Sequence, residues 1–73
     1  MIALINTFDR LPNHVGTIIS LHRSADAAEK ANRELQRSIQ RGHGRSAYLP
    51  TQISTVCKGR WRKGDSVRES EIA

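Results

Sequence analysis

Cysteine and long apolar runs are scarce in this chain of 73 residues. Its one cysteine, Cys57, excludes a disulfide within the chain and favours a reducing compartment over secretion. The N-terminal apolar stretch, residues 2–5, is far too short for the core of a signal peptide or for a membrane span. We therefore expect a cytoplasmic protein.

Motifs that specify chemistry are also lacking. The three histidines, His14, His22 and His43, are not spaced with Cys57 in any zinc-binding pattern. We expect Cys57, at the end of an apolar strand, to pack as a small hydrophobe. Three of the seven acidic residues, Asp26, Glu29 and Glu34, fall in helical i,i+4 pairs with basic residues, and nothing in the sequence supports a carboxylate pair for acid–base catalysis. We therefore expect no enzyme, no metal site and no cofactor.

The remaining pattern predicts a small α+β domain. Apolar and β-branched residues predict strands over residues 2–8 and 15–22, joined as a hairpin by a turn-bearing loop over residues 9–14. Ser24 begins an amphipathic helix that we expect to end at Gly42. Its apolar stripe consists of Ala28, Ala31, Leu35 and Ile39.

Two further strands are expected after the helix, a third over residues 49–57 and a short fourth around residues 60–63. The fold prediction is thus β-β-α-β(-β), a mainly antiparallel sheet in two layers with one helix over about residues 24–41. The domain would span residues 1–68, followed by a frayed tail over residues 69–73.

Apolar side chains on both faces of this sheet pose a packing problem. Adjacent residues of a strand point to opposite faces, and Leu4–Ile5 and Ile18–Ile19 are both adjacent apolar pairs. One helix covers only one face. The other face is covered either by the C-terminal segment with Trp61 or by a second copy of the chain. We favour the second copy, a homodimer, because so short a chain gains most from association.

Positive charge is concentrated in the second half of the chain. Residues 33–63 carry a net charge of +7, with eight basic residues against one acid, whereas the whole chain has a net charge of +5. A concentrated positive field indicates an anionic partner. The predicted phosphate-binding residues are Arg33, Arg37, Arg41, Arg45, Lys58, Arg60, Arg62 and Lys63.

The helical half of this set has two interpretations. Arg33, Arg37 and Arg41 recur at every fourth residue and form one stripe, which Arg45 extends. The stripe either holds phosphates or is a solvated helix face whose late arginines complement the helix dipole. The glycine-rich stretch over residues 41–45 could offer backbone N–H groups to an anion, although it matches no P-loop and follows a helix rather than preceding one.

The second half of the set surrounds the only tryptophan. If residues 58–63 are extended, Arg60 and Arg62 share one face and Trp61 takes the other. Trp61 then either stacks on a base or fills the core, and strand geometry favours the core. The sequence leaves open whether the two basic groups share one face of the protein.

Two functions follow from these patterns. The first is non-specific nucleic-acid binding through phosphate contacts, with DNA and RNA equally compatible. The alternative is a homodimeric interaction or assembly module without a nucleic-acid role. Neither function involves a membrane or a small-molecule substrate.

Overall fold

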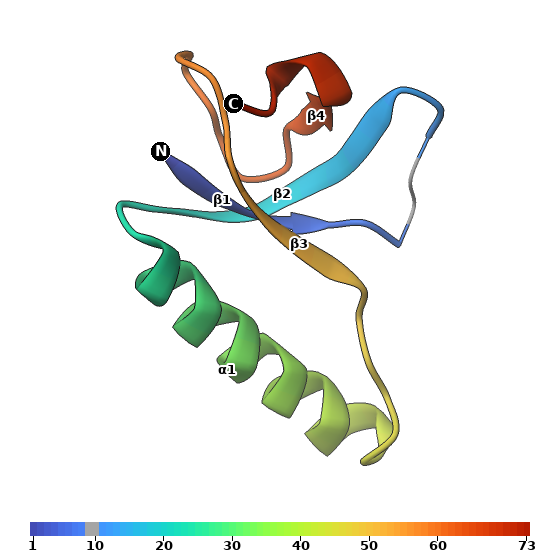
Figure 1. Ribbon diagram of the computed structural model, residues 1–73. Helices are drawn as coiled ribbons and strands as arrows, with labels where there is room; N and C mark the ends of the chain where they lie inside the picture. Colours follow the sequence, from blue (N-terminus) through green and yellow to red (C-terminus); the bar gives the residue numbers. More distant parts are fainter. Residues whose placement is uncertain (9–10) are drawn as a thin grey trace.

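The computed structural model describes residues 1–8 and 11–73 and confirms the expected α+β class. Four antiparallel strands form one sheet in the order β3-β1-β2-β4, and one long helix packs on it (Figure 1). Asp9 and Arg10, which begin the predicted hairpin loop, lie outside the described residues. The elements are β1 (Ile2–Asn6), β2 (His14–His22), α1 (Ala25–His43), β3 (Thr51–Thr55), β4 (Ser66–Arg68) and a short 3₁₀ helix, η1 (Glu69–Glu71).

Helix α1 begins where the sequence predicts and ends two residues later. The Ser24 hydroxyl accepts a hydrogen bond from the Ala27 N–H at 3.2 Å, which caps the first turn. The predicted end at Gly42 is wrong, because Gly42 lies inside the helix. Gly44 takes the positive φ of 104° that ends the helix, and its N–H donates to the Gln40 carbonyl.

The last two strands also differ from the prediction. Strand β3 covers Thr51–Thr55, shorter than the expected residues 49–57. The fourth strand is Ser66–Arg68, and residues 60–63 belong to a loop instead. The cause is a turn at residues 62–65, where the Asp65 carboxylate accepts from the Arg62 N–H at 2.8 Å and Gly64 adopts a φ of 95°.

The two faces of the sheet are covered by different parts of the chain. Ala3 and Ile5 on β1 join a core cluster on the face away from α1, whereas Leu4, between them, points to the helix. Residues 56–73 cross the face of the sheet that lies away from the helix (Figure 1). Their apolar side chains complete the cluster: Val56, Trp61, Val67 and Ile72. The chain thus covers its own second face, so the packing argument for a second copy no longer applies.

Residues 69–73 are held against the sheet, which differs from the frayed tail expected there. Ile72 forms a bridge with Val56, and the Cys57 N–H donates to the Glu71 carbonyl at 2.8 Å. The Ala73 N–H donates to the Thr55 carbonyl at 2.8 Å. The sequence offers no strong strand signal here because the segment contributes only one large apolar side chain, Ile72.

Strand β2 passes very close to β1 at Gly16. A Cβ atom at this position would lie 2.0 Å from the carbonyl oxygen of Asn6, and the Gly16 φ is 155°. Both the close approach and the backbone conformation require glycine. The pairing of β2 with β4 is irregular between His14 and Gly16, so Gly16 lies at a bulge.

A polar clamp joins the helix to the segment that returns to the sheet. Gln36 is buried, and its side-chain amide donates to the Leu49 carbonyl at 2.8 Å and accepts from the Leu49 N–H at 3.0 Å. The side-chain oxygen of Asn32 (Oδ1) accepts from the Gln36 amide nitrogen and from the Thr51 hydroxyl, at 3.2 and 2.9 Å. These bonds fix where the chain reverses after α1.

No helix within residues 1–8 and 11–73 is long and apolar enough to cross a membrane.

Candidate functional site

Three arginines lie on the outer side of α1, and Arg45 follows in the loop after its Gly44 cap. We call these four residues the helix surface (Arg33, Arg37, Arg41 and Arg45). Arg37 follows the buried Ala28 by nine residues, which is two and a half turns at about 3.6 residues per turn. It therefore points away from the sheet, with Arg33 and Arg41 one turn to either side. All four arginines are exposed.

Three of these arginines surround one hollow. An open depression of about 440 Å³ is lined by Arg37, Gln40, Arg41 and Arg45. Arg45 reaches it because the chain turns directly after the Gly44 cap, where the Ala47 N–H donates to the Gly44 carbonyl at 3.1 Å. The Gln36–Leu49 bonds hold the returning chain in place. The hollow thus presents guanidinium groups from two helical turns and from the following loop.

The second basic group, the loop surface, consists of Lys58, Arg60, Arg62 and Lys63. All four residues are exposed. Trp61 between them is half-buried and packs against the core cluster, and its indole N–H donates to the Cys57 carbonyl at 2.8 Å. Trp61 therefore has the structural role that the alternation of side chains in an extended segment favoured, although residues 60–63 form a loop and not a strand.

The loop surface has a fixed backbone. The Gly64 N–H donates to the Ile18 carbonyl, and the Ile18 N–H donates to the Asp65 carbonyl, both at 2.8 Å. Asp65 also closes the turn through Arg62, as described above. With Trp61 anchored beneath it, the loop holds its basic side chains outward.

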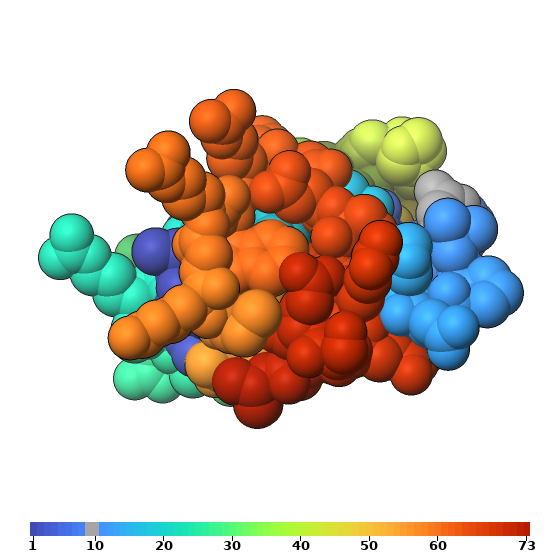
Figure 2. All heavy atoms as spheres, turned by 90° about the horizontal axis from the view of Figure 1, so that it is seen from above, coloured from blue at the N-terminus to red at the C-terminus, as the bar shows by residue number. Residues whose placement is uncertain are grey.

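The fold does not bring the two basic surfaces together. Helix α1 lies on one side of the sheet and residues 56–73 lie on the other (Figure 1). Figure 2, seen from the side of the C-terminal segment, shows residues around 58–63 (orange) projecting from this face, with α1 largely hidden beneath. Within the part of the chain that the structure describes, none of the eight basic side chains forms an ion pair. Each surface is thus a separate, uncompensated positive patch.

The backbone of residues 41–45 does not form the anion site considered from the sequence. Gly42 and His43 are helical, and the N–H of Gly44 is used by the Gln40 carbonyl. The N–H groups of both glycines of this stretch are therefore engaged by the helix or its cap, and the charged groups at this end of the helix are side chains.

Cysteine and histidine do not assemble into a reactive group. Cys57 is exposed, so the expectation that it packs as a small hydrophobe is wrong. It misses the core because Val56 takes the buried position and the strand ends there. His22 contacts the Ser20 hydroxyl at 2.7 Å, and His14 contacts that of Ser66 at 3.1 Å. Among the described residues, no three metal-ligating side chains gather at one place.

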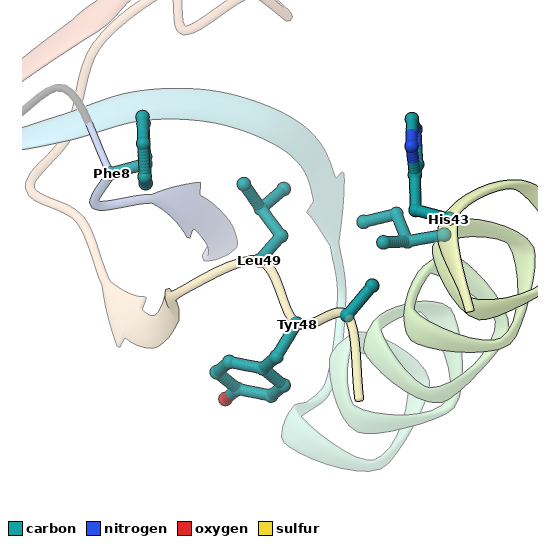
Figure 3. A pocket seen from close by; sticks show the side chains of 6 residues that line it. Phe8, His43, Tyr48 and Leu49 are labelled. Carbon is teal, nitrogen blue, oxygen red and sulfur yellow. The ribbon is translucent and has the colours of Figure 1, made fainter. Parts of the chain in front are cut away.

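Sequence reasoning missed one apolar hollow of about 410 Å³ near the end of α1. It is lined by Phe8, Ile39, His43, Ala47, Tyr48 and Leu49. Figure 3 shows Leu49 between Phe8 and His43, with the Tyr48 ring turned to the other side of the chain. Phe8 and Tyr48 are 69% and 64% exposed, unusually so for large apolar side chains. The hollow joins Phe8 to residues 39–49, which are about thirty positions or more away in the chain, so no local pattern predicts it.

Comparison with known proteins found no similar protein. No protein-family model matches the chain, and neither a curated protein nor a solved structure matches it.

Proposed function

We propose that the protein binds the phosphate backbone of nucleic acid through the helix surface. The observation that carries this proposal is the hollow in which Arg37, Arg41 and Arg45 face one space. Guanidinium groups bind phosphate oxygens in pairs and stay charged at any physiological pH. A phosphate in the hollow would have three such groups within reach, with Gln40 as a neutral donor.

The helix dipole alone does not account for this arrangement. The carboxyl end of a helix carries the equivalent of about half a negative charge. One basic residue in the last turn offsets it, and Arg41 and His43 both lie there. Arg37 and Arg45 lie outside the last turn of α1, so they add positive charge that the helix end does not require.

Binding of this kind would be electrostatic and largely independent of sequence. The helix surface lies on the exposed side of α1 and contains no aromatic side chain that could stack on a base. Each phosphate neutralised releases a condensed counterion, so affinity should fall steeply as salt rises. DNA and RNA share the phosphate backbone, and both are therefore suitable ligands.

A fluorescence-anisotropy titration tests the proposal. The wild-type protein is added to a short labelled DNA duplex and to a labelled single-stranded RNA, at low salt and then at increasing salt. We expect binding to at least one of the two, with the logarithm of the binding constant falling linearly with the logarithm of salt concentration. No binding at low salt, or binding insensitive to salt, would refute the proposal.

The apolar hollow favours a second candidate function, self-association. Phe8 and Tyr48 are exposed beside it, and Leu49 leads directly into β3, an edge strand whose five residues carry no charge. An uncharged edge strand is open to pairing with another strand. Sedimentation equilibrium of the wild type and of Tyr48→Ser tests this function, which predicts a dimer that the substitution weakens and is contradicted by a monomer at every concentration.

A further inference from the structure

We propose that the loop surface binds a second nucleic-acid segment while the helix surface binds the first, so that one copy of the protein bridges two segments. This inference rests on the proposed function, because it adds a second phosphate site to the first. The observation behind it is that the fold places the two basic surfaces on opposite sides of the sheet (Figures 1 and 2).

The two surfaces face away from each other. The arginines of the helix surface point away from the sheet, since Arg37 is on the opposite side of α1 from the buried Ala28. The loop surface lies beyond the other face, where Trp61 packs onto the core cluster and its basic neighbours stay exposed. The sheet and its two covers therefore stand between the two patches.

One duplex cannot easily serve both patches. The longest extent of the protein is 36 Å. Duplex DNA stays straight over a persistence length of about 50 nm, more than ten times that extent. A duplex on the helix surface would therefore have to bend sharply around the protein to reach the loop surface. A second duplex reaches it without bending.

The loop surface is built for phosphate rather than for bases. Its one aromatic side chain, Trp61, is engaged with the core and with the Cys57 carbonyl. Two backbone bonds to Ile18 hold the end of the loop, so this part of its backbone does not have to be ordered on binding. The nearest acid in the chain, Asp65, is half-buried and accepts from the Arg62 N–H.

A capture assay separates this inference from the proposed function. One DNA duplex is immobilised, protein is bound to it, and retention of a second, fluorescent duplex is measured after washing. Binding of the protein to the first duplex is measured in parallel. Three variants each remove two positive charges: a loop variant (Arg60→Gln, Arg62→Gln), a helix variant (Arg37→Gln, Arg41→Gln) and a control variant (Arg23→Gln, Arg68→Gln). Arg23 and Arg68 are exposed and belong to neither surface.

We expect the wild type and the control variant to capture the second duplex. The loop variant should still bind the first duplex through its intact helix surface and lose capture by about tenfold or more, because two phosphate contacts to the second duplex are removed. The helix variant should lose capture too. Capture should also decline when protein is in large excess, since each duplex is then occupied by separate copies.

Three results would overturn the inference. In the first, the loop variant captures the second duplex as well as the wild type does, which is the behaviour of a dimer with two helix surfaces. In the second, all three variants lose capture equally, which indicates net charge alone. In the third, the wild type binds one duplex and captures none, which leaves the proposed function standing without a bridge. Failure to bind even the first duplex would refute both.

Discussion

The side-chain amide of Gln36 pairs with the backbone of Leu49 as one strand pairs with another, donating to the carbonyl at 2.8 Å and accepting from the N–H at 3.0 Å. The Gln36 side chain thereby satisfies the backbone N–H and carbonyl of Leu49, as a neighbouring strand would in a sheet. The pairing sets where the chain returns from α1, and with it the position of Arg45 beside the helix end.

Replacing Gln36 with leucine should destabilise the protein by about 1–3 kcal/mol, because the part-buried N–H and carbonyl of Leu49 lose their partners. The substitution keeps an apolar stem of similar size, so cavity formation contributes little. Urea denaturation measures the change. The control is Gln40→Leu one turn later, where the side chain is exposed and the free energy of unfolding should change by less than about 0.5 kcal/mol. Equal effects of the two substitutions would contradict the clamp.

Gly16→Ala should be among the most damaging single changes to the sheet. The added Cβ would lie 2.0 Å from the backbone oxygen of Asn6, which cannot move without disrupting β1. Strain and overpacking each cost about 1–3 kcal/mol, so we expect a loss of at least about 3 kcal/mol in thermal or urea denaturation.

Gly42→Ala is the matched control for that change and should act in the opposite direction. A Cβ there meets nothing within 4 Å, and Gly42 lies inside α1. Alanine in a helix is favoured over glycine by about 0.5–1 kcal/mol, so the variant should be more stable than the wild type. A destabilised Gly42→Ala would mean that the helix ends before this residue.

Ser24→Ala should cost about 1 kcal/mol, because the first turn of α1 loses the side-chain acceptor that bonds the Ala27 N–H. Ser38→Ala, at an exposed position inside the helix, should leave stability unchanged or slightly raised, since alanine has the higher helix propensity. Circular dichroism at increasing temperature compares the two variants. A more stable Ser24→Ala variant would argue against the cap.

Trp61 should report on folding and not on ligand binding. Its ring packs on the core, so its fluorescence should shift to longer wavelength on unfolding. Trp61→Phe removes the hydrogen bond to the Cys57 carbonyl and should cost about 0.5–1.5 kcal/mol while leaving nucleic-acid affinity unchanged. Strong quenching of Trp61 on adding nucleic acid, with loss of affinity in Trp61→Phe, would instead indicate base stacking.

Patterns in the sequence predicted the features that depend only on residues close together in the chain. The Ser24 cap, the apolar stripe of α1 and the alternating faces of β1 all agree with the structure. The exact end of helix α1 was not predicted, because Gly42 and Gly44 both suit a helix C-cap. In the structure it is Gly44 that adopts the positive φ, so the helix continues past Gly42.

Long-range contacts could not be predicted in the same way. The fourth strand forms at Ser66–Arg68 because Val67 completes the core and pairs with Gly16, which lies 51 positions earlier in the chain. The Gln36–Leu49 clamp and the apolar hollow depend on the same kind of contact. The separation of the two basic surfaces also follows from topology, since nothing in the spacing of the eight residues indicates which side of the sheet each occupies.

The most direct test of phosphate binding by the helix surface compares salt dependence between two charge-matched variants. The helix variant (Arg37→Gln, Arg41→Gln) and the control variant (Arg23→Gln, Arg68→Gln) are titrated against the same duplex over a range of salt concentrations. The slope of the logarithm of the binding constant against that of salt should shrink by about 2 for the helix variant, roughly one unit per lost phosphate contact, and stay at the wild-type value for the control. Equal slopes for the two variants would contradict the assignment of the helix surface.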